Sequence, residues 1–302
     1  MSFLIYEESF PVEGVKDIHI NGTYHSVIVT FHDGNDLTVR QHDYDNAENF
    51  QMRADGNEIA IITEQWQFGT GFFLGFNVNP RLEVEMPKSY IENASFITSS
   101  GSISIENNAA WKNVILKTSS GSIKVNGCIT GDSIEAGTSS GSIKIEGTLI
   151  GETVSIGTSS GSIKLNDAIT GGTFEIGSSS GSVKIAGEIN CDKIDVSTSS
   201  GSISIYDAIV AEDISLESSS GSIKSARIHA SNITSLSRSG SQSHGDLITT
   251  KNIKMEATSG SIRAESANAT TYKINTSSGS ISIGELLGNG EATSRSGSVR
   301  TG

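Results

Sequence analysis

The sequence has few of the residues that usually build a globular core. Aromatic residues make up 6% of its 302 residues, and there are 3 prolines and 2 cysteines. No apolar run approaches the roughly 18 residues that a membrane-spanning helix needs. Basic residues are also scarce, with 21 Lys and Arg against 34 Asp and Glu. A net charge of −13 argues against a nucleic-acid partner, whose binding needs a cationic surface.

No secretory leader is recognisable in the sequence either. The first residues, Met1 to Glu8, lack a basic segment, and their apolar run is too short for a signal peptide. We therefore expect a cytoplasmic protein, or one associated with the cell envelope if a leader or anchor has been removed.

What the sequence does contain is a repeat of the type Thr-Ser-Ser-Gly-Ser-Ile. The first seven copies are spaced by twenty residues, and the last four drift by one or two. Their glycines are Gly101, Gly121, Gly141, Gly161, Gly181, Gly201, Gly221, Gly240, Gly260, Gly279 and Gly297. A fixed period of this length indicates stacked structural repeats.

Apolar residues within a repeat are spaced by two, as in Ile163 and Leu165 or Val154 and Ile156, which is the period of a half-buried strand. The phase changes at Ser-Ser-Gly, so we expect a bend there, with glycine supplying a positive φ. Each repeat then forms two short strands and a third, shorter one, at Ile169 and its equivalents. Stacking of such coils predicts an all-β, single-stranded parallel β-helix of about 20 residues per coil.

In that architecture the two cysteines lie about three coils apart, roughly 15 Å, and cannot form a disulfide. We expect Cys128 and Cys191 to be buried or half-buried.

Residues 1–97 lack the repeat, and we assign them to irregular β-rich coils and a cap; residues 98–302 form the regular β-helix of eleven repeats. Asp33–Asp36 separates two strand-like runs and predicts a hairpin turn. An open first coil would expose a sheet edge, which explains why a cap is needed.

The repeat motif, together with Arg81-Leu-Glu-Val-Glu-Met-Pro before the first copy, resembles the DUF4097 family of bacterial β-strand-repeat proteins, described as adhesins. The resemblance implies a bacterial origin, a right-handed β-helix and a link to the cell envelope. It supplies no catalytic residues. Serine replaces the aspartate that often follows the glycine in that family, so no ligand role of that aspartate transfers to this chain.

Two motifs that suggest chemistry have simpler explanations. Ser139, Ser159 and Ser179 match the G-x-S-x-G nucleophile motif, but no helix or histidine is expected beside them. Four histidines in the acidic segment, His19, His25, His32 and His42, lack metal-ligand spacing, and surface loops explain them better. We therefore expect no catalytic residues, no metal and no cofactor.

A column of threonine and serine three residues before each glycine could form either a buried hydroxyl ladder or an exposed ice-binding face. Period-two alternation places it on the core side, which favours the ladder.

Lysines three residues after the glycine form the most suggestive surface pattern. They are Lys124, Lys144, Lys164, Lys184 and Lys224. Alternation directs them outward, where Glu135, Glu146 and Glu175 could offset them and where lysine protects against aggregation. The alternative is a ladder that binds a polyanion.

The repeat at Gly240 breaks the apolar columns. Arg238, Gln242, His244 and Asp246 stand there, either because this coil is shifted in register, which we favour, or because it holds a buried polar cluster.

The sequence thus predicts a non-enzymatic, adhesin-like scaffold with a surface glycan or protein as partner. The alternative is a binding module for an anionic glycan or cell-wall polymer along the lysines.

Overall fold

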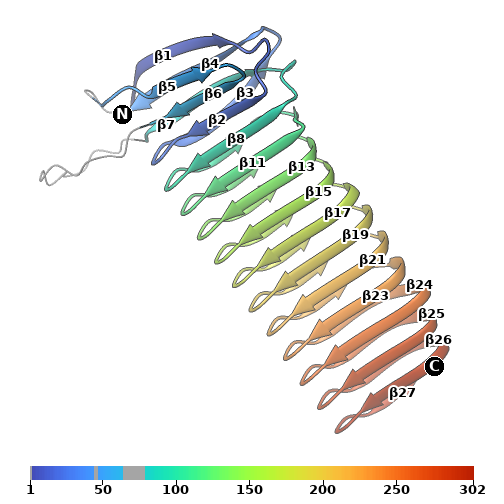
Figure 1. Ribbon diagram of the computed structural model, residues 1–302. Helices are drawn as coiled ribbons and strands as arrows, with labels where there is room; N and C mark the ends of the chain where they lie inside the picture. Colours follow the sequence, from blue (N-terminus) through green and yellow to red (C-terminus); the bar gives the residue numbers. More distant parts are fainter. Residues whose placement is uncertain (1, 44–46, 64–78) are drawn as a thin grey trace, which may run out of the picture. The chain divides into compact units, whose positions relative to one another are not determined.

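The computed structural model describes residues 2–43, 47–63 and 79–302 and divides into two compact units, Met1–Gly147 and Thr148–Gly302. All regular elements of the described residues are β-strands, which confirms the all-β class (Figure 1). In the same residues no helix is long and apolar enough to cross a membrane.

The described residues of the first unit form fourteen strands. They are β1 (Phe3–Pro11), β2 (Asp17–Asn21), β3 (Ser26–His32), β4 (Asp36–Asp43), β5 (Gln51–Asp55), β6 (Glu58–Ile62), β7 (Arg81–Pro87), β8 (Asn93–Thr98), β9 (Ile103–Ile105), β10 (Ala109–Ala110), β11 (Asn113–Thr118), β12 (Ile123–Val125), β13 (Ile129–Thr138) and β14 (Ile143–Ile145).

Two parallel ladders run through this unit, because each coil contributes one strand to each of them. One ladder runs β2–β8–β11–β13 and the other β3–β9–β12–β14. Equivalent residues pair directly, for example Ile103 with Ile123 and Ile123 with Ile143. The predicted parallel β-helix with aligned isoleucine columns is therefore confirmed.

Antiparallel strands close the outer end of both ladders. The coil β6–β7 stacks on β2–β3, although β6 and β7 come later in the chain. β5 then pairs antiparallel with β6, β4 with β7, and β1 with β4. The predicted hairpin at Asp33–Asp36 is wrong, because β7 lies between β3 and β4 and bonds to both of them. The boundary predicted at residue 98 stays a prediction.

The second unit consists of thirteen strands. They are β15 (Leu149–Thr158), β16 (Ile163–Leu165), β17 (Ile169–Ser178), β18 (Val183–Ile185), β19 (Ile189–Thr198), β20 (Ile203–Ile205), β21 (Ile209–Ser218), β22 (Ile223–Ser225), β23 (Ile228–Ser237), β24 (Gln242–Ala257), β25 (Ile262–Thr276), β26 (Ile281–Ser294) and β27 (Val299–Thr301).

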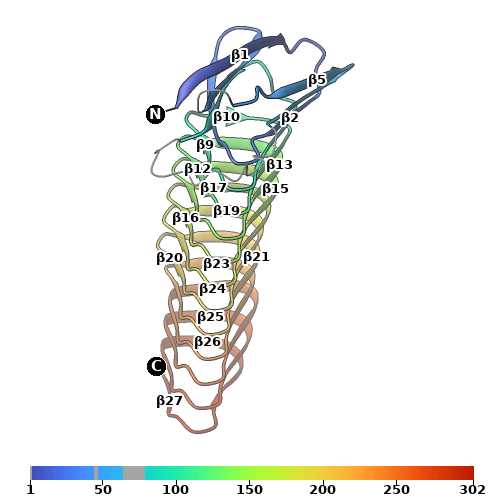
Figure 2. The ribbon, with the colours of Figure 1, turned by 90° about the vertical axis from the view of Figure 1, so that its left-hand side faces the viewer.

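Long and short strands alternate in its coils, with the short β16 and β20 on one side and the long β21 on the other (Figure 2). The third strand that we expected at Ile169 is the leading end of the ten-residue β17, which continues to Ser178. In β24 to β26 the short and long strands also merge into one. The apolar columns are buried throughout, as Ile163, Val183 and Ile203 illustrate.

The bend at Ser-Ser-Gly holds the coils together through the threonine column, which is buried as predicted. Thr198 Oγ1 accepts the N–H of Gly201 at 3.0 Å and donates to the carbonyl of Gly181, one coil back, at 3.0 Å. Ser178 does the same between Gly181 and Gly161. These bonds make a hydroxyl ladder inside the molecule, so this threonine column is not an exposed face that could bind ice.

The predicted reason for the bend glycines is wrong. Among described residues, glycines with positive φ are Gly14, Gly56, Gly171 and Gly288, and none of them is a bend glycine. A Cβ on Gly181 would instead lie 1.8 Å from the carbonyl oxygen of Gly161. Glycine is required there because successive bends stack with no space for a side chain.

Candidate functional site

In the first unit, the lysines that follow the repeat glycines are partly neutralised by nearby acidic side chains. Lys124 and Lys144 are paired across β12 and β14 and point outward. Lys144 forms an ion pair with Glu146, as predicted. Hydrogen bonds from Ser104 and Asn126, and then the charge of Lys124, lower the pKa of Glu106. Acids therefore stand close to both lysines.

The second unit carries a longer row of cations, which we call the basic ladder. Its strand-paired positions run from β16 to β27 and are occupied by Lys164, Lys184, Ser204, Lys224, Ser243, Arg263, Ser282 and Arg300. Its five cationic side chains are exposed, and none of them forms an ion pair with another described residue. Arg263 and Arg300 were missed in the sequence, although they too stand three residues after a repeat glycine.

Two of the acids predicted to offset the lysines do not do so. Glu135 binds Lys117 at 2.6 Å on the long strands. Glu175 lies across from Asp195, and burial together with Glu217 and Glu175 raises the pKa of Asp195. The prediction failed because these acids belong to the long-strand side of the coil, whereas the basic ladder occupies the short strands.

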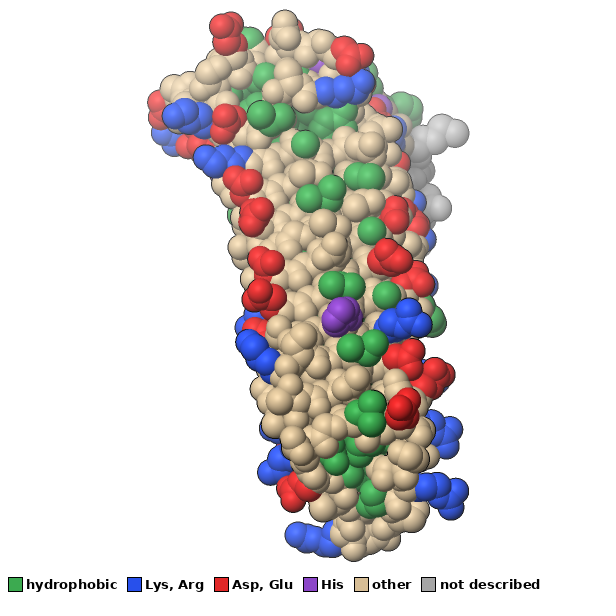
Figure 3. All heavy atoms as spheres, turned by 90° about the vertical axis from the view of Figure 1, so that its right-hand side faces the viewer, with side chains coloured by type: hydrophobic (Ala, Val, Ile, Leu, Met, Phe, Trp, Pro, Cys, Tyr) green, Lys and Arg blue, Asp and Glu red, His purple; other side chains and the backbone are tan. Residues whose placement is uncertain are grey.

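A further face of the molecule is nearly free of charge along its middle, with charged side chains gathered at both margins (Figure 3). In the second unit the leading ends of the long strands present a strand-paired row of mainly uncharged side chains, among them Ile150, Thr170, Asn190 and Val210. Charged side chains of both signs share the other columns of the long strands, where Lys193 lies across from Asp213.

The irregular coil at Gly240 is in register at Gln242 and His244, so the favoured prediction of a shifted coil is wrong for these residues; β24 shifts by one residue against β23 only further along, between the partners of Ala230 and Asn232. Gln242 pairs with Ile223 and Ile262, in the column that isoleucine normally fills. The single missing residue of this repeat is taken from the corner between β22 and β23, which leaves the strands aligned. A buried polar cluster, the alternative that we kept open, is what the structure shows.

His244 is the centre of this cluster. Its Nδ1 lies 2.7 Å from Ser225 Oγ and its Nε2 lies 3.1 Å from Ser235 Oγ, and all three side chains are buried. Burial lowers the pKa of His244 to about 4, so the imidazole is neutral at pH 7. Gln242 Nε2 donates to the carbonyl of Glu256 at 2.6 Å, whereas Gln242 Oε1 has no partner among the described residues.

The other two members of the predicted group lie outside the core. Arg238 is exposed in the bend that follows β23. Asp246 accepts from Ser266 Oγ at 2.8 Å and lies 3.5 Å from Arg227 Nε. The four residues therefore do not form one site.

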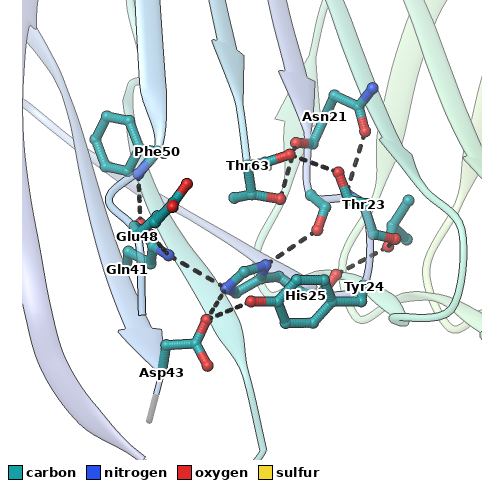
Figure 4. Close-up of polar contacts among 11 residues, drawn as sticks. Asn21, Thr23, Tyr24, His25, Gln41, Asp43, Glu48, Phe50 and Thr63 are labelled. Atoms are coloured by element: carbon teal, nitrogen blue, oxygen red, sulfur yellow. Dashed lines mark hydrogen bonds and ion pairs between the residues drawn. The ribbon is translucent and has the colours of Figure 1, made fainter. Parts of the chain in front are cut away.

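A second buried polar cluster lies in the cap of the first unit (Figure 4). His25 Nε2 lies 2.8 Å from Asp43 Oδ2, and both side chains are fully buried. Tyr24 donates to the same carboxylate oxygen, and His25 Nδ1 lies 3.1 Å from the carbonyl of Gly22. The surface-loop explanation is therefore wrong for His25. This histidine directly precedes β3 and is buried like Val27 and Val29 of that strand, and alternation in β4 turns Asp43 towards it.

Neither chemical motif gains a partner in the structure. Ser139, Ser159 and Ser179 are exposed in bends between strands, and no helix follows them in the described residues. No group of three metal-ligating side chains occurs in the part of the chain that the structure describes. Cys128 and Cys191 are free thiols, half-buried and buried respectively, as expected.

Solved structures with a similar course of the chain come from bacteria. One is a candidate adhesin from Parabacteroides distasonis ATCC 8503, with 12% identity, coverage of 98% of this chain and 96% of that chain, and a TM-score of 0.48. Another is a candidate lipid-binding protein from the same organism, with 13% identity, coverage of 98% and 96%, and a TM-score of 0.39. A candidate cell adhesion protein from Clostridium sporogenes ATCC 15579 has 8% identity, coverage of 70% and 99%, and a TM-score of 0.32.

None of the curated proteins matches the sequence significantly. A family model does match, over residues 15–209 and 191–301, which together include the cap strands from β2 onward and all the repeats. The protein therefore belongs to the Toastrack DUF4097 family.

Proposed function

We propose that this protein is a non-catalytic, adhesin-like scaffold that binds an anionic cell-surface polymer along its basic ladder. The observation that carries the proposal is the row of exposed cations on the short strands of the second unit, which lack ion pairs with described residues. Because such polymers belong to the cell envelope, the proposal includes a location there.

The spacing of the ladder supports this function. Lys164 and Lys184 are strand-paired neighbours, about 4.8 Å apart at the backbone. Like charges directly opposite each other destabilise a sheet. A polymer with repeated negative charges would remove this repulsion and gain several weak contacts at once.

Binding of polygalacturonate, an acidic polysaccharide, at about 20 mM and about 500 mM salt tests the proposal, since screening weakens contacts between exposed charges. The ladder variant is Lys164→Ser, Lys184→Ser and Lys224→Ser. Serine fits the column, because Ser204 and Ser243 already occupy it. We expect the wild type to bind at low salt and the ladder variant to bind at least about tenfold more weakly.

The control variant is Lys193→Ser, Lys251→Ser and Lys273→Ser, which removes the same charge from exposed positions of the long strands. We expect it to bind as the wild type does. An equal loss in both variants would reduce the effect to net charge, and no binding by the wild type would leave the lysines a role in solubility alone.

A further inference from the structure

A single aromatic side chain stands beside the basic ladder. Tyr206 follows β20 directly and is 59% exposed. Its N–H donates to the carbonyl of Ile185 at 3.0 Å, and in the next coil the N–H of Ala226 donates to Ile205 at 3.1 Å. This pattern places Ala186 and Ala226 as the stacking neighbours of Tyr206. The exposed tyrosine ring therefore lies between the methyl groups of these two alanines.

The ladder has a gap at the same coil. Ser204, two residues before Tyr206, occupies the ladder position between Lys184 and Lys224. The two lysines are thus two strand spacings apart, roughly 10 Å at the backbone. Small side chains and one aromatic ring form the floor between two cations.

This arrangement suits a sugar ring better than a bare phosphate. An exposed aromatic ring offers an apolar face with a polar tip, and such rings are enriched in binding surfaces. The C–H face of a pyranose can pack against that ring, whereas a phosphodiester has no comparable apolar face. Asp207, exposed on the far side of Tyr206 from the ladder, repels an anion and so confines it to the lysine side.

We propose that Tyr206, Lys184 and Lys224 form a subsite for an acidic polysaccharide, in which the tyrosine stacks on one sugar ring and the lysines bind the carboxylates or sulfates of the adjoining residues. The inference rests on the proposed function and narrows its ligand class from polyanions in general to anionic glycans.

The experiment compares two polyanions, polygalacturonate and inorganic polyphosphate, on the full chain with Tyr206→Ala, Tyr206→Phe and the ladder variant. Alanine fits the site, because Ala186 and Ala226 occupy the same column. We expect Tyr206→Ala to weaken polygalacturonate binding at least about fivefold and polyphosphate binding less than about twofold. Tyr206→Phe retains the ring and is expected to bind both polymers as the wild type does.

Loss of affinity for both polymers in Tyr206→Ala, or for neither, would overturn the subsite while leaving the basic ladder intact. Failure of the ladder itself is recognised separately, because the lysine variant would then bind both polymers as tightly as the wild type. Unchanged circular dichroism and melting temperature of Tyr206→Ala confirm that the fold is kept.

Discussion

The residue type at many positions of this fold is determined by how close that position lies to the coil above or below. Gly181 has an ordinary φ, yet its stacking on Gly161 leaves no space for a Cβ. Thr198 supplies the hydrogen bonds that join the same bends. The residues of the repeat motif are therefore required by contacts between coils more than by the local backbone conformation.

Glycine positions within one unit should differ sharply in their tolerance of alanine. Gly181→Ala places its methyl group 1.8 Å from a carbonyl oxygen, so we expect a loss of about 3 kcal/mol or more in unfolding free energy. Gly157→Ala meets nothing closer than 4.0 Å and should be neutral or stabilising by up to about 1 kcal/mol. Urea unfolding followed by circular dichroism measures both, and equal effects would contradict the stacking argument.

At this scale the sequence predicted which residues matter but not always why. Period-two counting correctly placed the threonine column inside. The same alternation could not show that the bend glycines keep a negative φ. A glycine every twenty residues is expected whether the bend needs a positive φ or the coils lie too close for a side chain, so the spacing does not distinguish the two causes.

The short-strand part of β24 keeps its register although its sequence departs from the repeat. In β24 the polar Gln242 and His244 remain in core columns, because the missing residue is absorbed at the corner before β23. Sequence alone favoured a register shift, because the repeat spacing there is nineteen residues and strands rich in serine and glycine slip easily in register. The hydroxyls of Ser225 and Ser235 bind both nitrogens of His244 and so offset the cost of burying this polar side chain.

His244 should make the protein less stable in mild acid. Its pKa is about 4 when folded, against an ordinary value of about 6.5 when unfolded, so the unfolded chain binds the extra proton first as pH falls. Its contribution is complete above about pH 6.5 and is lost as pH falls towards 4. Between about pH 7.5 and about pH 5 we expect a loss of about 2 kcal/mol.

The variant His244→Leu, which restores an aliphatic side chain in this column, should lack that part of the pH dependence. Unfolding free energies of the two proteins at the two pH values give the comparison. If wild type and variant lose stability in parallel between them, His244 is not the titrating group.

The sequence predicted that a cap is needed, but it did not predict the structure of the cap. An uncovered coil implied that something must protect it, and the strand-like runs of residues 15–40 were visible. Their order was not, because β6 and β7 stack outside β2 and β3 and this pairing depends on contacts distant in sequence. The buried pair His25 and Asp43 depends on the same arrangement, so it left no local signal.

On the scale of a whole unit, the short strands differ from the long strands in charge. The net charge of −13 conceals a row of cations on the short strands that form no ion pair with described residues, whereas the long strands carry charges of both signs. Composition alone therefore argued correctly against a strongly basic protein, yet it could not show a basic surface of one strand's width. The candidate site could be predicted only from the lysine spacing.

Affinity for polygalacturonate should rise with polymer length until the polymer spans the ladder. From Lys164 to Lys224 the ladder covers three strand spacings, roughly 14 Å, and it continues through Arg263 to Arg300. Each further cation reached adds a contact at little extra entropy cost. Titration with size-fractionated oligomers measures this, and equal affinity for the shortest and longest would show that the ladder does not bind along its length.

The hydroxyl ladder of the bends has an evolutionary consequence. Thr198 bonds to the glycine three residues ahead and to the one seventeen residues behind, and Thr118 and Thr138 do the same, so a unit of twenty residues contains the hydroxyl that joins its own bend to the previous one. A gene segment that duplicates one such unit adds a coil whose contacts are already correct. Genes for such chains can therefore gain or lose whole coils, and a longer binding surface can arise without any change to the cap.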